Sequence, residues 1–531
     1  MHNGTADVAF DVGAPNGPGT LASEIGKGSS RLPNTMTTTV YGLAQPVQYS
    51  PFRLSDSTAT MPRLHGPDFP FAPHEKLPPE LLSEIFRNLV DHTYMVSLWR
   101  GFSVRNMWSI SHVCSRWRQV AIATRELWDG VEVFLCLPED LGDWQLAVER
   151  ATPLIHDIFA RGTRSVYMHI KTPPGSYISS TRERYRNLAE KSSLIGAIIF
   201  PFAAQLKHIS LLCLDYLFVP FFKSPPISFP VLESITVKVG FPRDEWIYLD
   251  TVLGEMSLFE YAPNLRSVNL TEDGIVEDHP LSVRDRLEHL CAFHLPWIRL
   301  TDISICGAWI SIAEAFHLLS SCGNLVHCQF EIYDRGDDHL DDPDFDDPES
   351  IVLLQLQSMT LRCFYDHVTE RFLAPLYLPS LTIYTSQGVS FEPGFADLVT
   401  RSRCRLKKVD INRGQRPHTQ AIEEFLGQVS ETLEELITPC WPIPSSATSK
   451  IASGSLLPRL RVIHCYIDSV EDFAPIQEML RCRSSGSVGL MPSDIDTAVV
   501  VGYIPYLKMD ALRAAYIEHL SGRTFEMKHG W

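Results

Sequence analysis

Residues 206–211 read LKHISL, and this arrangement of apolar residues returns nine more times before residue 466. The next two copies are LESITV at 232–237 and LRSVNL at 265–270. Successive side chains of a strand point to opposite faces, so the fourth and sixth positions of the pattern share one face. The residue between them points the other way. The pattern therefore predicts a series of strands, each with one face in a shared core.

The spacing of the ten copies indicates a repeat architecture, because their first leucines lie 22 to 35 residues apart. These leucines are Leu206, Leu232, Leu265, Leu300, Leu325, Leu356, Leu378, Leu406, Leu433 and Leu460. In the seventh copy, we assign Leu378, Leu381 and Ile383 to the core. A strand of the form L-x-x-L-x-L at such a period is typical of a leucine-rich-repeat solenoid, although these repeats are longer and less regular than usual.

The residue between the two core positions is polar in nine of the ten copies, which predicts one wet strand face. These residues are Ser210, Thr236, Asn269, Ser304, Gln329, Thr360, Thr382, Asp410, Ile437 and His464. Helix-like stretches at 313–321, 395–402 and 421–429 separate the strands. We therefore predict an α/β fold of parallel strands with outer helices. A doubly wound α/β domain also alternates strand and helix, but it would not repeat one strand pattern ten times.

Upstream of the repeats, residues 76–133 contain two short amphipathic segments. The first opens on Pro78 and Pro79, which suit the first turn of a helix. Its apolar stripe is broad and comprises Leu81, Leu82, Ile85, Phe86, Leu89 and Val90. The second segment has helical spacing and comprises Ile110, Val113, Cys114, Trp117 and Ala121. Two helices of this length cannot hide so much apolar surface, which favours a protein–protein interface.

These residues resemble the F-box, as found in the large repeat-containing families of mushroom-forming fungi. The matching positions are Leu77-Pro78, Leu82, Ile85-Phe86, Leu89, Val113-Cys114, Trp117-Arg118 and Leu127-Trp128. The resemblance covers about residues 76–130, and it departs from the pattern at 91–107, which is long for the loop joining the helices. An ordinary helical hairpin that caps a larger domain is the alternative.

The resemblance implies that this segment docks a Skp1-like adaptor and, through it, a cullin. The contacts carried over are Leu77, Pro78, Leu82, Ile85, Phe86, Val113, Cys114 and Trp117. Some of these side chains must instead hold the helices together. Trp117 is the strongest candidate for an interface hot spot or a core residue.

The chain divides by composition and pattern into five parts. Residues 1–74 are rich in proline and glycine, which predicts disorder. The F-box spans 75–130, a junction with irregular first repeats 131–200, the solenoid 201–490 and a C-terminal cap 491–531. In the junction we expect strands at 131–133 and 166–170 around a helix at 141–161. Near the C-terminus we expect a helix at 470–481, a strand at 497–502 and an end helix at 510–520.

Composition limits the partners and the compartment. The 531 residues are 45% hydrophobic and 21% charged, as in soluble globular proteins. A formal net charge of −17 argues against nucleic-acid binding, which needs a basic face. The twelve cysteines show no CxxC pair, and several, including Cys306, Cys328 and Cys465, lie in strand-like segments. We therefore expect buried thiols in a reducing compartment, no membrane association and a cytoplasmic or nuclear protein.

The sequence lacks the phosphate-binding, dinucleotide-binding and zinc-protease motifs, so we expect no catalytic residue, no cofactor and no metal, and hence no enzyme. Residues 485–489, SGSVG, resemble a nucleophile elbow but lack its first glycine. The acidic run 334–349 permits a calcium reading, but it lacks the turn glycine and flanking helices of an EF-hand. A solvated loop is the favoured interpretation.

Together these features predict a substrate-receptor subunit of a Skp1–cullin–F-box ubiquitin ligase. The target protein would bind the polar strand face, at Ser234, Thr236, Asn269, Gln329, Thr360, Arg362, Lys408 and Asp410. Two alternatives stay open at this point. One is a repeat scaffold that binds no adaptor, and the other is a sensor in which a small ligand joins the receptor to its target.

Overall fold

The fold comes from a computed structural model, and the described residues belong to one compact unit, Phe71–Trp531. The residues that it describes are 77–89, 93–97, 110, 113–135, 142–163, 166–171, 193–214, 221–222, 224–240, 257–273, 294–332, 350–363, 365–387, 393–412, 419–440, 442–467, 473–484, 495–502 and 524–529. Residues 1–74, the acidic run 334–349, residues 485–489 and the expected end helix 510–520 lie outside these ranges.

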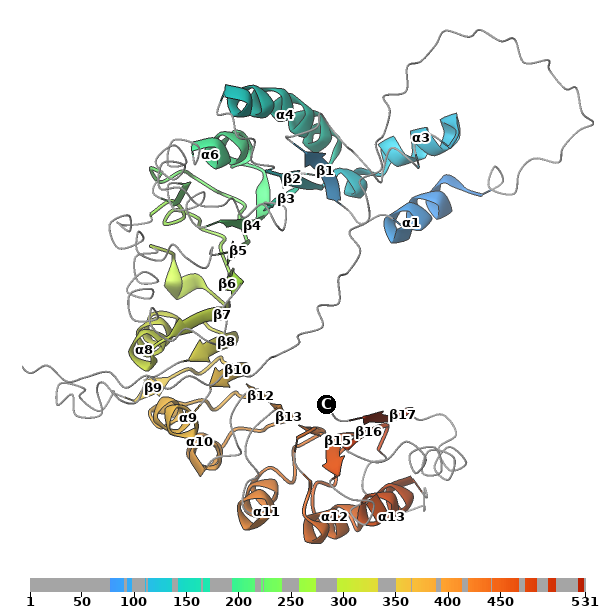
Figure 1. The fold of residues 1–531 in the computed structure, drawn as a ribbon, viewed down its shortest axis with the longest axis vertical. Coiled ribbons are helices and arrows are strands. Elements are labelled where there is room, and N and C mark those ends of the chain that lie inside the picture. The colour runs from blue at the N-terminus through green and yellow to red at the C-terminus, as the bar shows by residue number, and fades with distance from the viewer. Residues whose placement is uncertain are drawn as a thin grey trace, which may run out of the picture. The chain divides into compact units, whose positions relative to one another are not determined.

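A single large parallel sheet of 15 strands organises the described residues, and its strands follow one another in chain order (Figure 1). The strands are β1 (Thr93–Ser97), β2 (Gly130–Phe134), β3 (Val166–Lys171), β4 (Leu206–Leu214), β5 (Ser234–Gly240), β6 (Ser267–Asp273), β7 (Asp302–Ile310), β8 (His327–Ile332), β10 (Ser358–Cys363), β12 (Ile383–Gln387), β13 (Lys408–Asn412), β14 (Glu435–Thr438), β15 (Val462–Ile467), β16 (Thr497–Gly502) and β17 (Thr524–His529). A separate pair joins β9 (Ile351–Val352) to β11 (Leu376–Tyr377).

Helices connect many of these strands, as is usual in a parallel sheet. They are α1 (Pro79–Leu89), α3 (Ser115–Ala123), α4 (Gly142–Arg161), α6 (Ser193–Ile199), α8 (Ile312–Ser321), α9 (Asp366–Leu373), α10 (Pro393–Ser402), α11 (Thr419–Gln428), α12 (Ser445–Ala452) and α13 (Phe473–Ser484). Short 3-10 turns are η2 (Arg125–Trp128), η3 (Phe200–Phe202) and η7 (Trp297–Arg299). Figure 1 shows α8 to α13 on one side of the strand layer. The predicted α/β fold with a large parallel sheet is confirmed.

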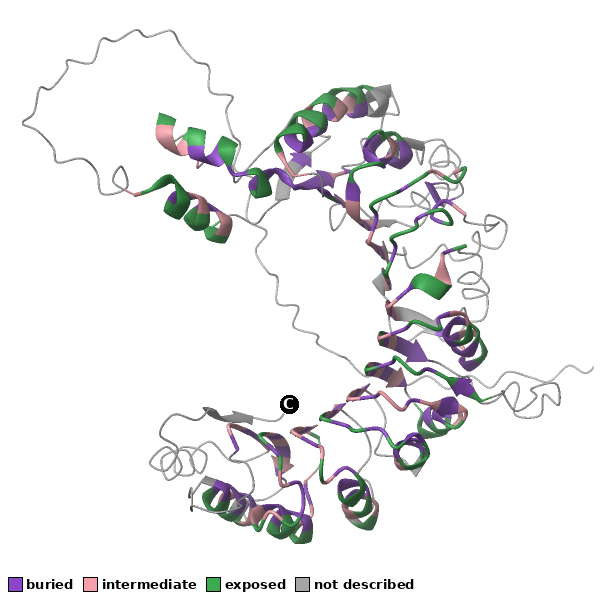
Figure 2. Ribbon diagram, turned by 180° about the vertical axis from the view of Figure 1, so that it is seen from behind, coloured by how far each residue is buried: buried purple, intermediate pink, exposed green. Residues whose placement is uncertain are grey.

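The repeated leucines form the core between strands and helices. All ten first leucines of the pattern are fully buried, and purple core positions alternate with half-buried ones along the strands (Figure 2). In β10, for example, Met359 and Leu361 are buried, whereas Ser358, Thr360 and Arg362 are half-buried. The period of two in the sequence therefore corresponds to one dry and one wetter strand face.

The register of the seventh repeat differs from the prediction. Tyr384 pairs with Met359 of β10 and with Val409 of β13, so the core positions of this repeat are Leu381, Tyr384 and Ser386. Our assignment of Ile383 to the core is wrong, and Thr385 replaces Thr382 on the wet face. The sequence misled us because Leu378 and Leu381 are both buried and lie three residues apart, so either leucine fits the first position.

Hydrogen bonds between consecutive turns explain the correct register. In three repeats, the residue before the first core leucine donates a side-chain hydrogen bond to a carbonyl of the preceding turn. Asn324 Nδ2 lies 2.8 Å from the Ile298 carbonyl oxygen, and Ser380 Oγ lies 2.6 Å from that of Leu354. Asn264 Nδ2 bonds the Pro230 carbonyl oxygen in the same way. Ser380 directly precedes Leu381, so its hydrogen bond follows this rule only if Leu381 is the first core leucine of the repeat.

The sheet extends beyond the ten strands of the leucine pattern at both ends. Strands β2, β3 and β16 and helices α4 and α13 lie at or within two or three residues of their predicted positions. The sequence did not predict β1, which lies within the 91–107 segment and pairs with β2, or β17, which pairs with β16. Neither has a copy of the leucine pattern, so the repeat gave no signal for them.

Several cysteines serve as small core residues in the described repeats, as expected, whereas Cys440 and Cys482 are exposed. Cys328 and Cys465 are buried and free of disulfides, and Cys306 is half-buried. Burial raises the pKa of the Cys465 thiol to about 12, which keeps it protonated.

A buried arginine joins the last two described helices. The Arg483 guanidinium donates four hydrogen bonds of 2.9 to 3.3 Å to backbone carbonyls. One acceptor, Ile451, lies in the last turn of α12, and the others, Leu457, Pro458 and Leu460, follow that helix. The side chain is therefore a bridge between two repeats and not a surface charge.

Replacing Arg483 by methionine is expected to lower the free energy of unfolding by about 2–4 kcal/mol, because buried carbonyls lose a charged donor. Chemical denaturation followed by circular dichroism measures the change. The matched control is Arg481→Met on the same helix, since Arg481 is exposed and forms an ion pair with the exposed Glu478. Equal stability of the two variants would contradict the bridging role.

Candidate functional site

The first candidate surface is the helical pair formed by α1 and α3. Leu82 and Phe86 of α1 are fully buried, four residues apart on one side of the helix. The Phe86 ring packs against Trp117 of α3, with ring centroids 5.2 Å apart. These three side chains hold the two helices together. Of the predicted adaptor contacts, they are therefore the ones that act as core.

The start of α3 differs from the prediction. We expected Val113 and Cys114 inside a helix, but α3 begins at Ser115. Cys114 has extended backbone angles, and its Sγ accepts a hydrogen bond from the Trp117 N–H, so it caps the helix. Arg116 donates a hydrogen bond of 2.5 Å to the Leu77 carbonyl oxygen, which ties the entry of α1 to α3.

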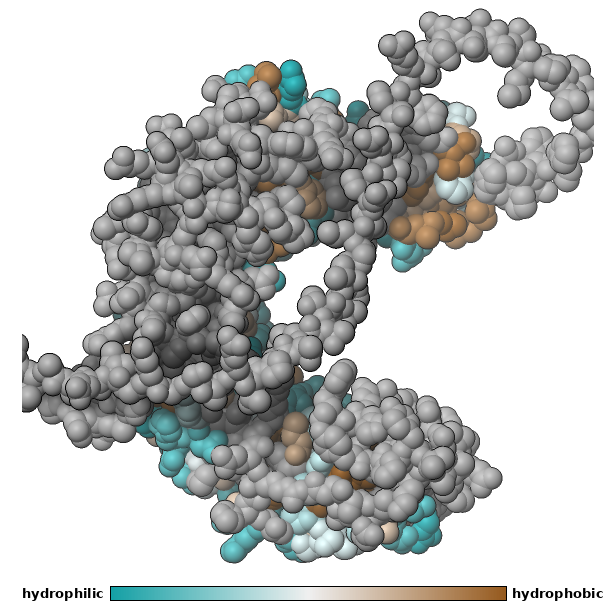
Figure 3. All heavy atoms as spheres, viewed as in Figure 1, coloured by the Kyte–Doolittle hydropathy of each residue, from teal (hydrophilic) through white to brown (hydrophobic). Residues whose placement is uncertain are grey.

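An exposed apolar patch remains on the helical pair. Its members are Leu81 (52% exposed), Ile85 (36%), Leu89 (69%), Val113 (53%) and Ile122 (46%). Leu81, Ile85 and Leu89 follow one another at intervals of four residues and share a side of α1. Figure 3 shows hydrophobic side chains gathered over α1 and α3. A patch of this kind is typical of a surface that binds another protein.

The predicted adaptor contacts differ in exposure, and only some of them belong to the patch. Ile85 and Val113 belong to it, and Pro78 is exposed beside it. Leu77, Cys114 and Trp117 are half-buried, and Leu82 and Phe86 are buried. The site list from the sequence omitted Leu81, Leu89 and Ile122. The first two were visible in the apolar stripe, but a stripe this wide does not show which half faces the neighbouring helix.

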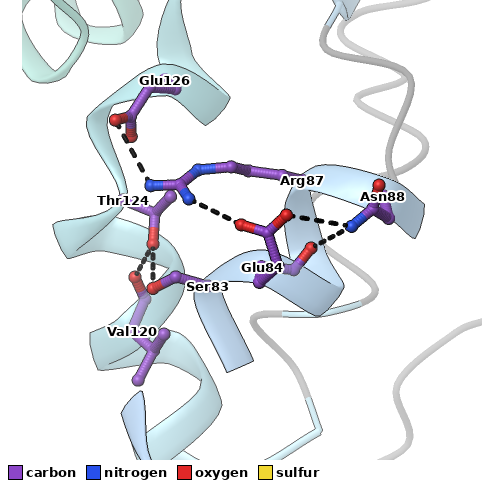
Figure 4. Close-up of polar contacts among 7 residues, drawn as sticks. All are labelled: Ser83, Glu84, Arg87, Asn88, Val120, Thr124 and Glu126. Carbon is purple, nitrogen blue, oxygen red and sulfur yellow. Dashed lines mark hydrogen bonds and ion pairs between the residues drawn. The ribbon is translucent and has the colours of Figure 1, made fainter. Parts of the chain in front are cut away.

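A pocket of about 530 Å³ is lined by residues of α1, α3 and η2 together with Thr124 and Thr163. Ser83 and Thr124 join across the pocket at 2.9 Å, and Thr124 Oγ1 also donates to the Val120 carbonyl oxygen (Figure 4). Arg87 pairs with Glu84 at 2.9 Å and with Glu126 at 3.4 Å. The ion pairs are exposed and weak, so the network orients the helices more than it stabilises them.

The helical pair is attached directly to the first strands. Trp128 donates its indole N–H to the Ala121 carbonyl oxygen at 3.0 Å, and the Arg161 guanidinium lies 4.9 Å from the Trp128 ring centroid. Asp129 accepts from both the N–H and the hydroxyl of Thr163, at 2.5 and 2.9 Å. A Cβ on Gly162 would lie 2.7 Å from Asp129 Oδ1, so this junction requires glycine.

The second candidate surface is the strand face, the wetter side of the sheet. Its central row runs in register through twelve strands and comprises Glu132, His169, Ser210, Thr236, Asn269, Ser304, Gln329, Thr360, Thr385, Asp410, Ile437 and His464. All eight predicted target-binding residues lie on this face. Five of them are in the central row, while Ser234, Lys408 and Arg362 are in the flanking rows. Their role in binding stays a prediction.

Ion pairs link neighbouring strands of this face. The buried carboxylate of Glu331 pairs with Arg362 at 3.3 Å, and Lys408 pairs with Glu435 at 3.0 Å. Glu132 pairs with Lys171. Burial raises the pKa of Asp410, an effect that Lys408 opposes. Two of the charged groups predicted to contact a target, Arg362 and Lys408, are therefore engaged with glutamates of the neighbouring strands, which fixes their positions.

Two histidines on adjacent strands escaped the sequence analysis. His169 on β3 and His208 on β4 are half-buried on the strand face. Burial, the largest cause, and nearby lysines lower the pKa of both imidazoles, with Lys171 acting on His169 and Lys207 on His208. Their proximity depends on the register of two strands, and no motif in the sequence indicates it.

These pKa shifts predict an acid sensitivity of the fold. A histidine whose folded pKa lies below its unfolded value binds its proton first in the unfolded state. Stability therefore falls as pH drops below about 6.5 towards the folded pKa values. The double variant His169→Gln, His208→Gln is expected to lose less stability than the unaltered chain between pH 7.5 and 5.5. Thermal unfolding at several pH values measures this, and parallel pH profiles would contradict it.

A metal site of three or more ligands and a membrane-spanning helix are both absent from the described residues. No group of three or more histidine, cysteine, aspartate or glutamate side chains among them is arranged to hold a metal ion. None of the helices in the described ranges is long and apolar enough to cross a membrane. A comparison with models of known protein families finds no match to this sequence, and a comparison with curated protein sequences finds none either.

Proposed function

We propose that this protein is a substrate receptor of a Skp1–cullin–F-box ubiquitin ligase. In this proposal the helical pair is an F-box that binds a Skp1-like adaptor, and the adaptor joins the chain to a cullin. The parallel sheet with its helices is an irregular leucine-rich-repeat solenoid that holds the target protein.

The observation that carries the proposal is the apolar patch on the helical pair. Its side chains come from the same two segments whose sequence resembles the F-box, yet they are not needed for the contact between α1 and α3. Leu82, Phe86 and Trp117 already provide that contact. Each large apolar side chain left exposed and then buried by a partner contributes roughly 1.5–3 kcal/mol.

The repeats support the target-binding half of the proposal. Stacked repeats form a long surface on which many short contacts add up, which is the usual use of such folds. The strand face offers hydroxyl, amide and charged groups held in register. The chain would perform no bond chemistry itself and would instead bring a target lysine close to a ubiquitin-charged enzyme carried by other subunits.

Binding of a purified fungal Skp1 by the full chain tests the proposal. We expect a one-to-one complex in biolayer interferometry and in size-exclusion chromatography. A repeat scaffold that uses no adaptor predicts no complex although the chain is folded by circular dichroism. That outcome would reject the ligase proposal.

A further inference from the structure

A row of residues without polar side chains runs along one edge of the repeats, where each turn of the chain enters its strand. The row consists of the residues two positions before the first core leucine in six consecutive repeats: Pro230, Pro263, Ile298, Gly323, Leu354 and Pro379. Ile298 is 67% exposed and Leu354 is 62% exposed, and only Pro379 is half-buried. Single exposed apolar residues are common on protein surfaces, but an aligned series is typical of an interface.

Hydrogen bonds between consecutive turns hold this row in register. Three positions after each member, a backbone N–H donates to a carbonyl of the preceding turn at 2.8 to 2.9 Å. Side chains add bonds to the carbonyls of the row itself, as where the Arg299 guanidinium donates to the Pro263 carbonyl oxygen at 3.0 Å. Neighbouring members of the row therefore lie about one strand spacing apart, which is about 4.8 Å.

The edge carries few charges. The residues directly after the members of the row are Val231, Asn264, Arg299, Asn324, Gln355 and Ser380, so one of these twelve positions is charged. The acidic residues within four positions of the row are Glu233, which pairs with Lys207 at 3.2 Å, Glu260 and Asp302. The whole chain has a net charge of −17, so two copies repel each other least where acidic groups are sparse.

The sizes of the side chains make the row complementary to itself when it is read backwards. Gly323 lies between the two largest members, Ile298 and Leu354, and a Cβ on Gly323 would meet no atom within 4 Å. In an antiparallel pair with its twofold axis between the turns of Ile298 and Gly323, each Ile298 would lie against Gly323 of the second copy. Leu354 would then lie against Pro263 of the second copy.

We propose that this edge is the interface of a symmetric homodimer, in which the rows of two copies pack antiparallel and each Ile298 fills the space over the opposite Gly323. The partner is a second copy of this chain because the row offers apolar groups of self-complementary size and almost no charge to repel an identical chain. The inference goes beyond the proposed receptor role and does not rest on it.

The size of the edge predicts a weak dimer. Six turns at about 4.8 Å give a strip about 24 Å long. To bury the about 800 Å² per partner of a standard interface, the strip would have to be about 33 Å wide, well beyond the about 10 Å that separate packed layers. We therefore expect a reversible dimer with a dissociation constant in the micromolar range or above.

The response to salt is a second signature of the proposed dimer. Apolar contacts do not need charge, whereas the remaining repulsion between two chains of net charge −17 is screened by added salt. The dimer should therefore strengthen as the salt concentration rises. A dimer held by ion pairs would weaken instead, and that result would overturn the apolar packing.

Sedimentation velocity of the full chain without adaptor tests the proposal. We expect a monomer–dimer equilibrium whose dimer fraction grows between about 1 and 200 µM, the range that suits micromolar affinity. Ile298→Asp should weaken the dimer at least about tenfold, because it places a carboxylate against the second copy. A chain that stays monomeric throughout this range would overturn the proposal, and the edge would then be left for a different protein.

A pair of glycine variants provides the matched comparison. Gly323→Leu adds a side chain where the chain itself leaves open space, so it should fold normally and yet weaken the dimer at least about tenfold. Gly427→Leu on α11 also points into open space, and neither glycine has a positive φ. Gly427→Leu should keep the dimer. Circular dichroism checks that all variants fold. A dimer that persists in Ile298→Asp or Gly323→Leu, or that is lost in Gly427→Leu, would overturn the proposed packing. Because no adaptor is present, the outcome is independent of the ligase proposal.

Discussion

Replacing Ile85 and Leu89 together by aspartate is expected to weaken Skp1 binding at least about 100-fold while the chain stays folded. Both side chains belong to the exposed patch of α1, and neither is needed to hold α1 against α3. In the proposed complex each would be buried by the adaptor, so the substitution removes apolar contacts and adds two carboxylates that must be desolvated. Titration of adaptor in biolayer interferometry measures the loss.

Two controls separate binding from folding. Leu354→Asp changes an exposed leucine of the repeats and should leave adaptor binding intact. Leu82→Asp places a charge in the core of the helical pair and should unfold that pair, with loss of helical signal. A folded Ile85→Asp, Leu89→Asp variant that binds Skp1 as tightly as the unaltered chain would refute docking through the patch.

Replacing Tyr384 by alanine is expected to lower the free energy of unfolding by about 3–5 kcal/mol, the range for removing a buried aromatic side chain. Tyr384 is 2% exposed, and its ring stacks on Phe395 with centroids 3.9 Å apart. Phe395 in turn contacts Phe425 of the next repeat. The cavity would therefore disturb two consecutive repeats.

The neighbouring residue provides the matched comparison. Ile383 is half-buried on the strand face, so Ile383→Ala should cost less than about 1.5 kcal/mol. Urea denaturation of the two variants ranks them. The reverse order would restore the register in which Ile383, and not Tyr384, points into the core.

The leucine pattern was sufficient to predict the parallel sheet because each copy combines an alternation of two with a fixed anchor. It failed in the seventh repeat, where Leu378 and Leu381 both satisfy the anchor, and only the strand pairing of Tyr384 and the hydrogen bond from Ser380 in the structure distinguish them. Strand β1 was missed for a related reason, since five residues without an anchor carry no register.

The candidate sites were predictable to different degrees. The polar strand face follows from alternation within each strand, so all eight predicted residues lie on it. The helical stripe was visible, but its division into core and patch depends on where α3 packs. The placement of His169 and His208 on adjacent strands depends on the register of β3 against β4, and no local pattern encodes it.

The junction at Trp128, Asp129 and Gly162 joins the helical pair to the first strands of the sheet. Hydrogen bonds and close packing, not a flexible tether, form this junction. If the pair binds an adaptor as proposed, the adaptor would be attached at one end of the sheet. Neighbouring strands are about 4.8 Å apart, so each further strand lies about 4.8 Å beyond the one before it. In the proposed complex, the strand that binds a target would then determine which lysine of the target comes within reach of ubiquitin.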